Sequence, residues 1–471
     1  MVLIPMRRSL AWILLAAGAA PAARLLTPAD VNAFRELSEI ALSPDGRAVA
    51  AVAGEGNILV FDIESGRSRA LTEGKFRDSS LRWSPDGTRI AFLSDRKGAS
   101  LWVAEVLSGK LTPVTDIVHS NFWLPGRGSG LEWSPDSVRL AFVGADPETP
   151  APRTDPRVIT RIQFKGRTDF SDDRREHIWT VDASGGKPHP LTRGDYHEHS
   201  ISWSGRRIGF VSNRRPDPDA VHNYDVFTVE VDSGSIARLT DTPGCEYAPV
   251  FSPDGRWIAY TATTRAITTI DSVAEDAHVW VAPAAGGAPR ELNHALDRRS
   301  SSPRWAPDSR SVFFLAGDRG RTLIYNVALE GGAARPVFEK DATVSAFAAS
   351  SKLVYLMGDD RRLAEIHAAD QPLTDNNRAL TEVRLAEPIR LEYPSFGGAR
   401  IEGWLLPPVD RQSGKKVPIG AQCPRRAARH VRLLLGAEPA TPGSGGPRLR
   451  GALPEPSRIE RLRAEVQRRL R

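Results

Sequence analysis

A short phrase, Ser-Pro-Asp-Gly after a large apolar residue, recurs along the chain and limits its possible folds more than any other feature. Complete copies stand at residues 42–46, 83–87 and 251–255. Variant copies lie at 133–137, 203–205, 305–309 and, in degenerate form, 349–352. Successive copies are roughly 40 to 55 residues apart, except for an insertion before Ser204, and this spacing is typical of one four-stranded propeller blade.

The phrase has the chemistry of a tight turn, because proline presets φ, aspartate bonds forward to the backbone and glycine tolerates a positive φ. A short apolar run follows each turn, often with a small residue in its middle, as suits a strand packed between sheets. These runs are residues 90–93, 140–143, 208–211 and 258–260, and third strands are expected at 101–103, 178–181, 226–229 and 279–281. The sequence therefore predicts an all-β fold, a β-propeller of about seven four-stranded blades over residues 37–378, with its tryptophans packed between blades.

The N-terminus has the pattern of a secretory signal peptide. Arg7 and Arg8 precede an apolar run at residues 10–20, and a small-residue cleavage site follows at 20–22. We expect residues 1–22 to be removed and the mature chain to be exported, periplasmic or extracellular, with no stable membrane span. An uncleaved anchor, or a start at Met6, is the alternative.

Several segments outside the repeated phrase resemble a known family of peptidases. They are residues 27–31, 158–161, 212–219, 239–244, 393–407 and 415–418. Together with the repeats they are similar to the prolyl oligopeptidase family of serine peptidases, in its dipeptidyl- and acylaminoacyl-peptidase-like branch. The resemblance implies a propeller domain at 23–378 that admits only small peptides. It also implies a linker and the opening strands of an α/β-hydrolase domain at 379–418.

The family's pattern stops after Pro418. The oxyanion-hole segment is missing there, and no Gly-x-Ser-x-Gly nucleophile elbow occurs anywhere in the sequence. Residues 419–471 contain twelve arginines, four glutamates and no lysine. We interpret them as a disordered, out-of-frame tail of a truncated or frameshifted peptidase, and therefore expect no catalytic residues and no catalysis. The alternative is an RNA- or lipid-binding tail with a helix at 455–470.

The charge and the cysteines narrow the possible partners. The tail's excess of eight positive charges exceeds the whole chain's net charge of +6, so the basicity says nothing about the propeller. We expect no nucleic-acid partner, and we take peptides or a protein surface at the propeller face as the ligands. Cys245 and Cys423 are the only cysteines, too few for a disulfide framework or a cysteine metal site, and no cofactor is expected.

Three polar segments qualify as candidate sites, and each also has a plainer interpretation. Residues 195–199 contain possible metal ligands, but a polar loop is the preferred reading. Asp217 and Asp219 could offer carboxylates to Ca²⁺, although a turn is expected. The insertion at 147–175 resembles a projecting arm, and a solvated loop is preferred over a role in access to an active site; its charged residues are Asp169, Asp172, Asp173, Arg174 and Arg175. We therefore assign no catalytic, cofactor-binding or metal-binding residue.

Two functional hypotheses follow from these observations. The first is the substrate-gating propeller of an exported serine peptidase that lacks its catalytic machinery. The second is a stand-alone periplasmic propeller that binds or scaffolds other proteins, similar to that of the Tol system. The hydrolase-like residues 391–418 favour the first, because a stand-alone propeller has no use for them.

Overall fold

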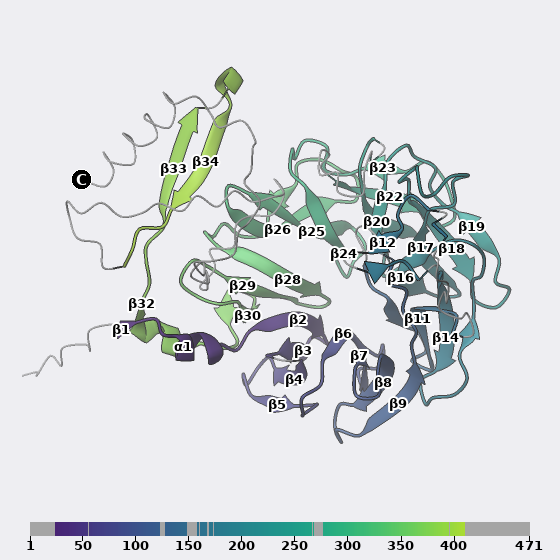
Figure 1. Cartoon of the computed structure of the whole chain (residues 1–471), viewed down its shortest axis with the longest axis horizontal. Helices are drawn as coiled ribbons and strands as arrows, with labels where there is room; N and C mark the ends of the chain where they lie inside the picture. The colour runs from purple at the N-terminus through teal and green to yellow at the C-terminus, as the bar shows by residue number, and fades with distance from the viewer. Residues whose placement is uncertain are drawn as a thin grey trace, which may run out of the picture.

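The computed structural model describes residues 24–409, except positions 55, 123–127, 148–157, 160, 167–168, 173, 266, 268–276 and 395. The expected signal peptide, residues 415–418 and the expected tail lie outside the described residues. Within them, the predicted all-β fold is confirmed, and seven antiparallel four-stranded units follow one another around a ring (Figure 1). The last two units are joined into one eight-stranded sheet by a single parallel pair, Thr322 with Thr343.

Each blade is formed by four strands in chain order. The first four blades are β2 (Leu37–Leu42), β3 (Ala48–Ala53), β4 (Asn57–Asp62), β5 (Ser68–Ala70); β6 (Asp78–Trp83), β7 (Arg89–Ser94), β8 (Ser100–Glu105), β9 (Leu111–Asp116); β10 (Leu131–Trp133), β11 (Arg139–Ala145), β14 (Glu176–Asp182), β15 (His189–Pro190); and β16 (Glu198–Ser204), β17 (Arg207–Ser212), β18 (Asp225–Glu230), β19 (Ile236–Arg238). The last three are β20 (Glu246–Phe251), β21 (Trp257–Ala262), β22 (His278–Pro283), β23 (Arg290–Glu291); β24 (Ser300–Trp305), β25 (Ser311–Asp318), β26 (Arg321–Ala328), β27 (Arg335–Pro336); and β28 (Thr343–Ala349), β29 (Leu353–Gly358), β30 (Glu365–Ala368), β31 (Gln371–Pro372). First strands of neighbouring blades contact one another, which places them nearest the axis.

The ring closes by hydrophobic packing between its first and last blades. Leu37 and Phe61 of the first blade share a buried cluster with Val354 and Ile366 of the seventh. Each blade takes its described strands from one continuous stretch of chain, so the two end blades exchange no strand. The end blades are joined by this apolar contact and by hydrogen bonds such as the pair between Arg35 and Asn377, while β1 pairs with β32 outside the blades.

The repeated turns show the hydrogen bonds that the sequence predicts. In the first blade the Asp45 carboxylate accepts from the Ser43 hydroxyl at 2.6 Å and from the Arg47 amide at 3.0 Å, and Gly46 has φ of 70°. Where serine replaces this glycine, at Ser137 and Ser309, φ is still 62° and 60°. Each of these serines accepts a hydrogen bond from the amide of the corresponding aspartate in an earlier blade, which ties the blades together.

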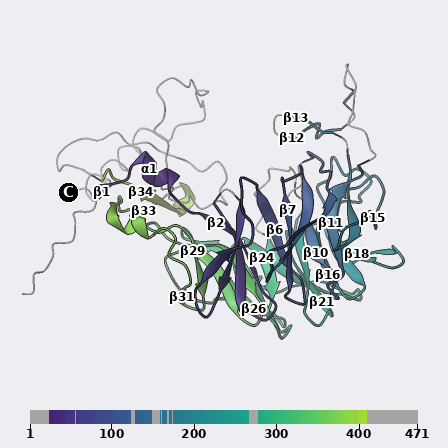
Figure 2. The same cartoon turned by 90° about the horizontal axis from the view of Figure 1, so that it is seen from below.

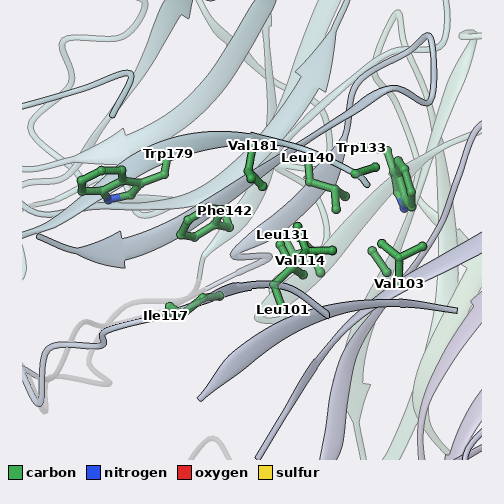
Figure 3. Close-up of a cluster of buried hydrophobic side chains, with 12 residues drawn as sticks. Leu101, Val103, Val114, Ile117, Leu131, Trp133, Leu140, Phe142, Trp179 and Val181 are labelled. Atoms are coloured by element: carbon green, nitrogen blue, oxygen red, sulfur yellow. The ribbon is translucent and has the colours of Figure 1, made fainter. Parts of the chain in front are cut away.

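The tryptophans pack between blades, as the sequence predicts. At the end of three first strands, the indole Nε1 donates to a carbonyl of a preceding blade at 2.9 Å; the pairs are Trp83 with Ala41, Trp133 with Arg82, and Trp305 with Val250. Figure 3 shows the core between the second and third blades, where Leu101 and Val103 face Leu131 and Phe142. The fourth and fifth blades also pack tightly, because a Cβ on Gly209 would lie 3.2 Å from the Phe251 ring.

Several elements lie outside the blades. They are β1 (Arg24–Leu25), which pairs in parallel with β32 (Val383–Arg384), the helix α1 (Pro28–Asn32), the 3-10 turns Arg378–Glu382 and Phe396–Gly398, and the hairpin of β33 (Ile389–Pro394) and β34 (Arg400–Leu405). The hairpin lies within residues 379–418, where the resemblance implies two opening strands. Within the insertion, β12 (Lys165–Gly166) and β13 (Asp169–Phe170) form a small sheet that projects from one face of the ring (Figure 2). In the described part of the chain, no helix is long and apolar enough to cross a bilayer.

Candidate functional site: a polar cavity between the third and fourth blades

The two faces of the ring carry different connections. Since the strands of a blade alternate in direction, the Ser-Pro-Asp-Gly turns share one face with the turns between third and fourth strands. The opposite face carries the links from second to third strands and from each blade to the next. A cavity of about 220 Å³ opens on this second face; its lining residues are Phe122, Arg161, Arg175, Asp195, Tyr196, His197, Asn213, Asp217, Pro218, Asp219 and Tyr224.

The three polar segments that the sequence offered as candidate sites, residues 195–199, 217–219 and 147–175, all contribute side chains to this one cavity. Residues 218–220 form the expected turn. The polar-loop interpretation of residues 195–199 is wrong for their second half, because Glu198 and His199 are buried in β16, and His197 just before them is buried too. In the part of the chain that the structure describes, His197 and His199 join no group of three metal ligands.

The root of the arm is held by ion pairs and hydrogen bonds, which differs from the solvated loop that the sequence favoured. The Arg175 guanidinium lies 2.7 Å from the Asp195 carboxylate, and Arg161 reaches Asp195 at 3.6 Å and Asp219 at 3.8 Å. The Asp172 carboxylate accepts from the Ser120 hydroxyl at 2.9 Å. The arm's base therefore forms a charged wall of the cavity, whereas Asp173 lies outside the described residues.

An aromatic pair forms another wall. The His197 ring stacks on Phe122 with centroids 4.5 Å apart and planes 13° from parallel. The Glu176 amide lies 3.4 Å from His197 Nδ1 and donates to it, which favours the tautomer that carries its proton on Nε2. Burial raises the pKa of the Tyr224 phenol, so this side chain stays neutral. The cavity thus combines both signs of charge with a flat aromatic surface.

A buried carboxylate lies directly behind the cavity wall. Glu198 is fully buried and accepts from Arg214 at 2.9 Å, from His177 Nδ1 at 2.6 Å and from the Thr192 hydroxyl at 3.1 Å. Three donors around one carboxylate compensate its desolvation and hold the start of β16 in place.

This carboxylate belongs to a structural repeat that the sequence reading missed. Asp78, Glu198 and Glu246 occupy the same register, each opposite the last residue of the second strand in its blade. The arginine two residues beyond that strand binds the carboxylate in two of the three blades, as Arg96 and Arg214; Thr264 stands at this position in the third. Each acid follows a Leu-Thr pair by six residues, and that spacing could have revealed the repeat.

The hairpin of β33 and β34 contacts the face that bears the cavity. Trp404 lies over Gly320, between β25 and β26, so closely that a Cβ on Gly320 would come within 2.4 Å of the indole. Arg361, between β29 and β30, pairs at 2.5 Å with Glu387, which precedes the hairpin. Both contacted segments link second to third strands, as do two of the segments that line the cavity. The hairpin and the cavity therefore share one face of the ring.

Comparisons with known protein families agree with this architecture. A model of the TolB β-propeller domain matches residues 158–396, just over half of the chain, and a model of the N-terminal region of dipeptidyl peptidase IV matches residues 43–154. Dipeptidyl-peptidase 5 of Porphyromonas gingivalis is 24% identical over 438 residues, which cover 84% of this chain and 63% of the relative.

Two solved structures have a similar fold. An acylaminoacyl peptidase of Pyrococcus horikoshii matches with a TM-score of 0.64 and 19% identity, over 82% of this chain and 59% of the other. The β-propeller domain of the Trilobed protease of Pyrococcus furiosus, described as having an open velcro topology, matches with a TM-score of 0.54 and 19% identity, over 73% of this chain and 99% of that domain.

The fold and the family match together define the class of this chain, which is a β-propeller domain of the TolB type. Within that class, the matched dipeptidyl peptidase IV region and the dipeptidyl-peptidase relative support a propeller of a prolyl oligopeptidase-family peptidase. The chain spans less than two thirds of the length of two of these proteins, 63% of the dipeptidyl-peptidase and 59% of the acylaminoacyl peptidase.

Proposed function

We propose that this chain is the substrate-gating propeller of an exported serine peptidase, and that it binds peptides without cleaving them. One observation carries the proposal: the cavity and the hairpin at residues 389–405 share a face of the ring. In the resemblance drawn from the sequence, that hairpin opens the hydrolase domain. A peptide held in the cavity would then lie on the side where the catalytic domain belongs.

The cavity suits a short peptide with charged groups. Arg161 and Arg175 can bind a carboxylate, while Asp195 and Asp219 can bind an ammonium group. The stacked rings of Phe122 and His197 offer a flat surface for an apolar side chain. Cleavage needs a nucleophile, its base and an orienting acid, and no Gly-x-Ser-x-Gly occurs in the sequence.

Binding of a short fluorescent peptide to the full chain tests this proposal. Arg175→Met should weaken the affinity about tenfold or more, because a charge-assisted contact contributes about 1.5 to 3 kcal/mol. Arg206→Met, on the opposite face, is the matched control and should bind as the parent chain does. Mass spectrometry should recover the peptide uncut. Equal affinity of both variants, or a peptide cleaved in a way that a serine-directed fluorophosphonate blocks, would contradict the proposal.

A stand-alone propeller that binds a protein surface is the second candidate, and the TolB-domain match at residues 158–396 favours it. The packing of Trp404 against Gly320 speaks against it, since the hairpin covers part of the face that a protein partner would use. The same peptide assay separates the two candidates, because only a peptide held in the cavity should lose affinity in Arg175→Met and not in Arg206→Met.

Export is the remaining part of the proposal. We expect the chain to lose about 22 residues, because an apolar run at 10–20 and a small-residue site at 20–22 follow two arginines. Mass spectrometry of a periplasmic fraction should find an N-terminus near Ala23. Recovery of the Met1 or Met6 form from the cytoplasm alone would rule export out.

A further inference from the structure

We propose that His278, Glu291 and His294 form a site for a zinc ion, or a similar divalent transition metal, at the rim of the fifth blade. The three donor atoms lie within 4.8 Å of one another. They are the one such group of three among the described residues. This site is independent of the peptide cavity and of the function proposed for it.

The fold of the fifth blade brings the three residues together. Trp280 of β22 stands opposite Glu291 of β23, so His278, two residues earlier on the same side of the sheet, is the diagonal neighbour of Glu291. Leu292 and Asn293, which follow Glu291, are both hydrogen-bonded to Val279. The Val279 amide donates to the Asn293 side chain at 2.7 Å, and the Val279 carbonyl accepts from the Leu292 amide at 2.8 Å. His294 therefore follows at a fixed distance from His278.

The donor atoms lie close enough together to share one ion. His278 Nδ1 is hydrogen-bonded to Oε1 of Glu291, and His294 Nδ1 lies 3.2 Å from Oε2. A tetrahedral zinc ion with bonds of about 2.0 to 2.1 Å separates its ligand atoms by roughly 3.3 Å. We expect side-chain rotations to direct all three donors at one ion, which would replace the hydrogen bond between His278 and Glu291.

The exposure of the three side chains suits a cation with one open coordination position. His278 and Glu291 are 14% exposed and are held by the sheet, whereas His294 is 87% exposed and can turn toward an ion. Nδ1 of His278 faces the carboxylate, and Nε2 has no hydrogen-bond partner in the described residues, so a turn of the ring would break no other hydrogen bond of the ring nitrogens. Two imidazoles and one carboxylate are a common zinc ligand set, and solvent beside His294 supplies a fourth ligand.

A bound ion would join β22 to the link between the fifth and sixth blades. The outer strand β23 has only two residues, so few backbone bonds hold it. His278 opens a third strand and His294 lies in a blade-to-blade link, which puts the ion on the face that also bears the cavity. The ion would fix this part of the rim.

Zinc titration of the chelator-treated full chain tests the inference. We expect one zinc ion per chain with micromolar or tighter affinity, and a higher melting temperature with Zn²⁺ than with Mg²⁺. His294→Ala, at an exposed position that leaves folding intact, should weaken zinc binding at least tenfold and abolish the shift. Glu291→Gln should act in the same direction.

His189→Ala is the matched control, because His189 is exposed on the two-residue outer strand β15 of the third blade. It should bind zinc as the parent chain does. Cobalt(II) should give the visible bands of a tetrahedral site in the parent chain and not in His294→Ala. Zinc affinity that is the same in the parent and His294→Ala, or no zinc binding by the parent chain, would overturn the inference.

Discussion

Replacing Arg96 by methionine is expected to lower the free energy of unfolding by about 3 to 5 kcal/mol. The Asp78 side chain is completely buried, and Arg96 is its only cationic partner among the ion pairs of the described residues. Without the guanidinium, the Asp78 carboxylate keeps its hydrogen bond from the Thr72 hydroxyl, at 2.6 Å, but it no longer has a positive charge beside it. Methionine retains an apolar chain beside Phe76, so the change isolates the charge more than the packing.

Urea unfolding at pH 7 measures this effect. Arg206→Met is the control, because its side chain is 77% exposed and its pair with Asp232 contributes about 0.5 kcal/mol or less. A loss below about 1 kcal/mol for Arg96→Met would show that the buried carboxylate does not need this arginine.

The ring could be predicted because its determinants are local. Each Ser-Pro-Asp-Gly turn fixes its own backbone within four residues, and the repeat spacing then sets the number of blades. Trp83 and Trp133 follow the same logic, since each stands beside a turn and contacts the preceding blade. Even the glycine-to-serine changes fit the pattern, because Ser137 keeps a positive φ.

The buried charges could not be predicted in this way, because their burial depends on partners elsewhere in the chain. In the sequence, Glu198 looks like part of a polar loop. In the fold it is surrounded by Arg214, from the loop after β17, and by His177, from the preceding blade. The cavity could not be predicted for the same reason, because its residues come from separate parts of the chain. Its walls come from four connections that share no repeated phrase and meet only after the third and fourth blades have packed together.

The third copy of the buried carboxylate repeat differs from the other two in one respect. Glu246 is completely buried, but Thr264 stands where the other two blades have arginine. The Thr242 hydroxyl donates to Oε1 at 2.5 Å, whereas Oε2 has no partner among the described residues. Burial, with a smaller contribution from the nearby Asp225 carboxylate, raises the pKa of Glu246 to about 8. The folded chain therefore holds a neutral glutamic acid at pH 7.

This raised pKa gives the stability a pH dependence of known sign. The unfolded chain releases the proton near pH 4.5 and the folded chain near pH 8. Between these values the unfolded state binds fewer protons, so the contribution of Glu246 to stability falls as the pH rises, and it is constant above about pH 8. The whole loss is roughly 3 to 5 kcal/mol.

Glu246→Gln should remove this loss, because the amide stays neutral at every pH and keeps an oxygen for the Thr242 hydroxyl. At pH 9 we expect the variant to be more stable than the parent chain by about 3 to 5 kcal/mol, and near pH 4.5 the two should be nearly equal. Urea unfolding at several pH values measures the difference. Glu330→Gln makes the same change at an exposed position and should follow the parent chain throughout. A difference between Glu246→Gln and the parent chain that stays constant from pH 4.5 to 9 would mean that Glu246 is ionised in the fold, and that the missing arginine is compensated by another charge such as Arg238.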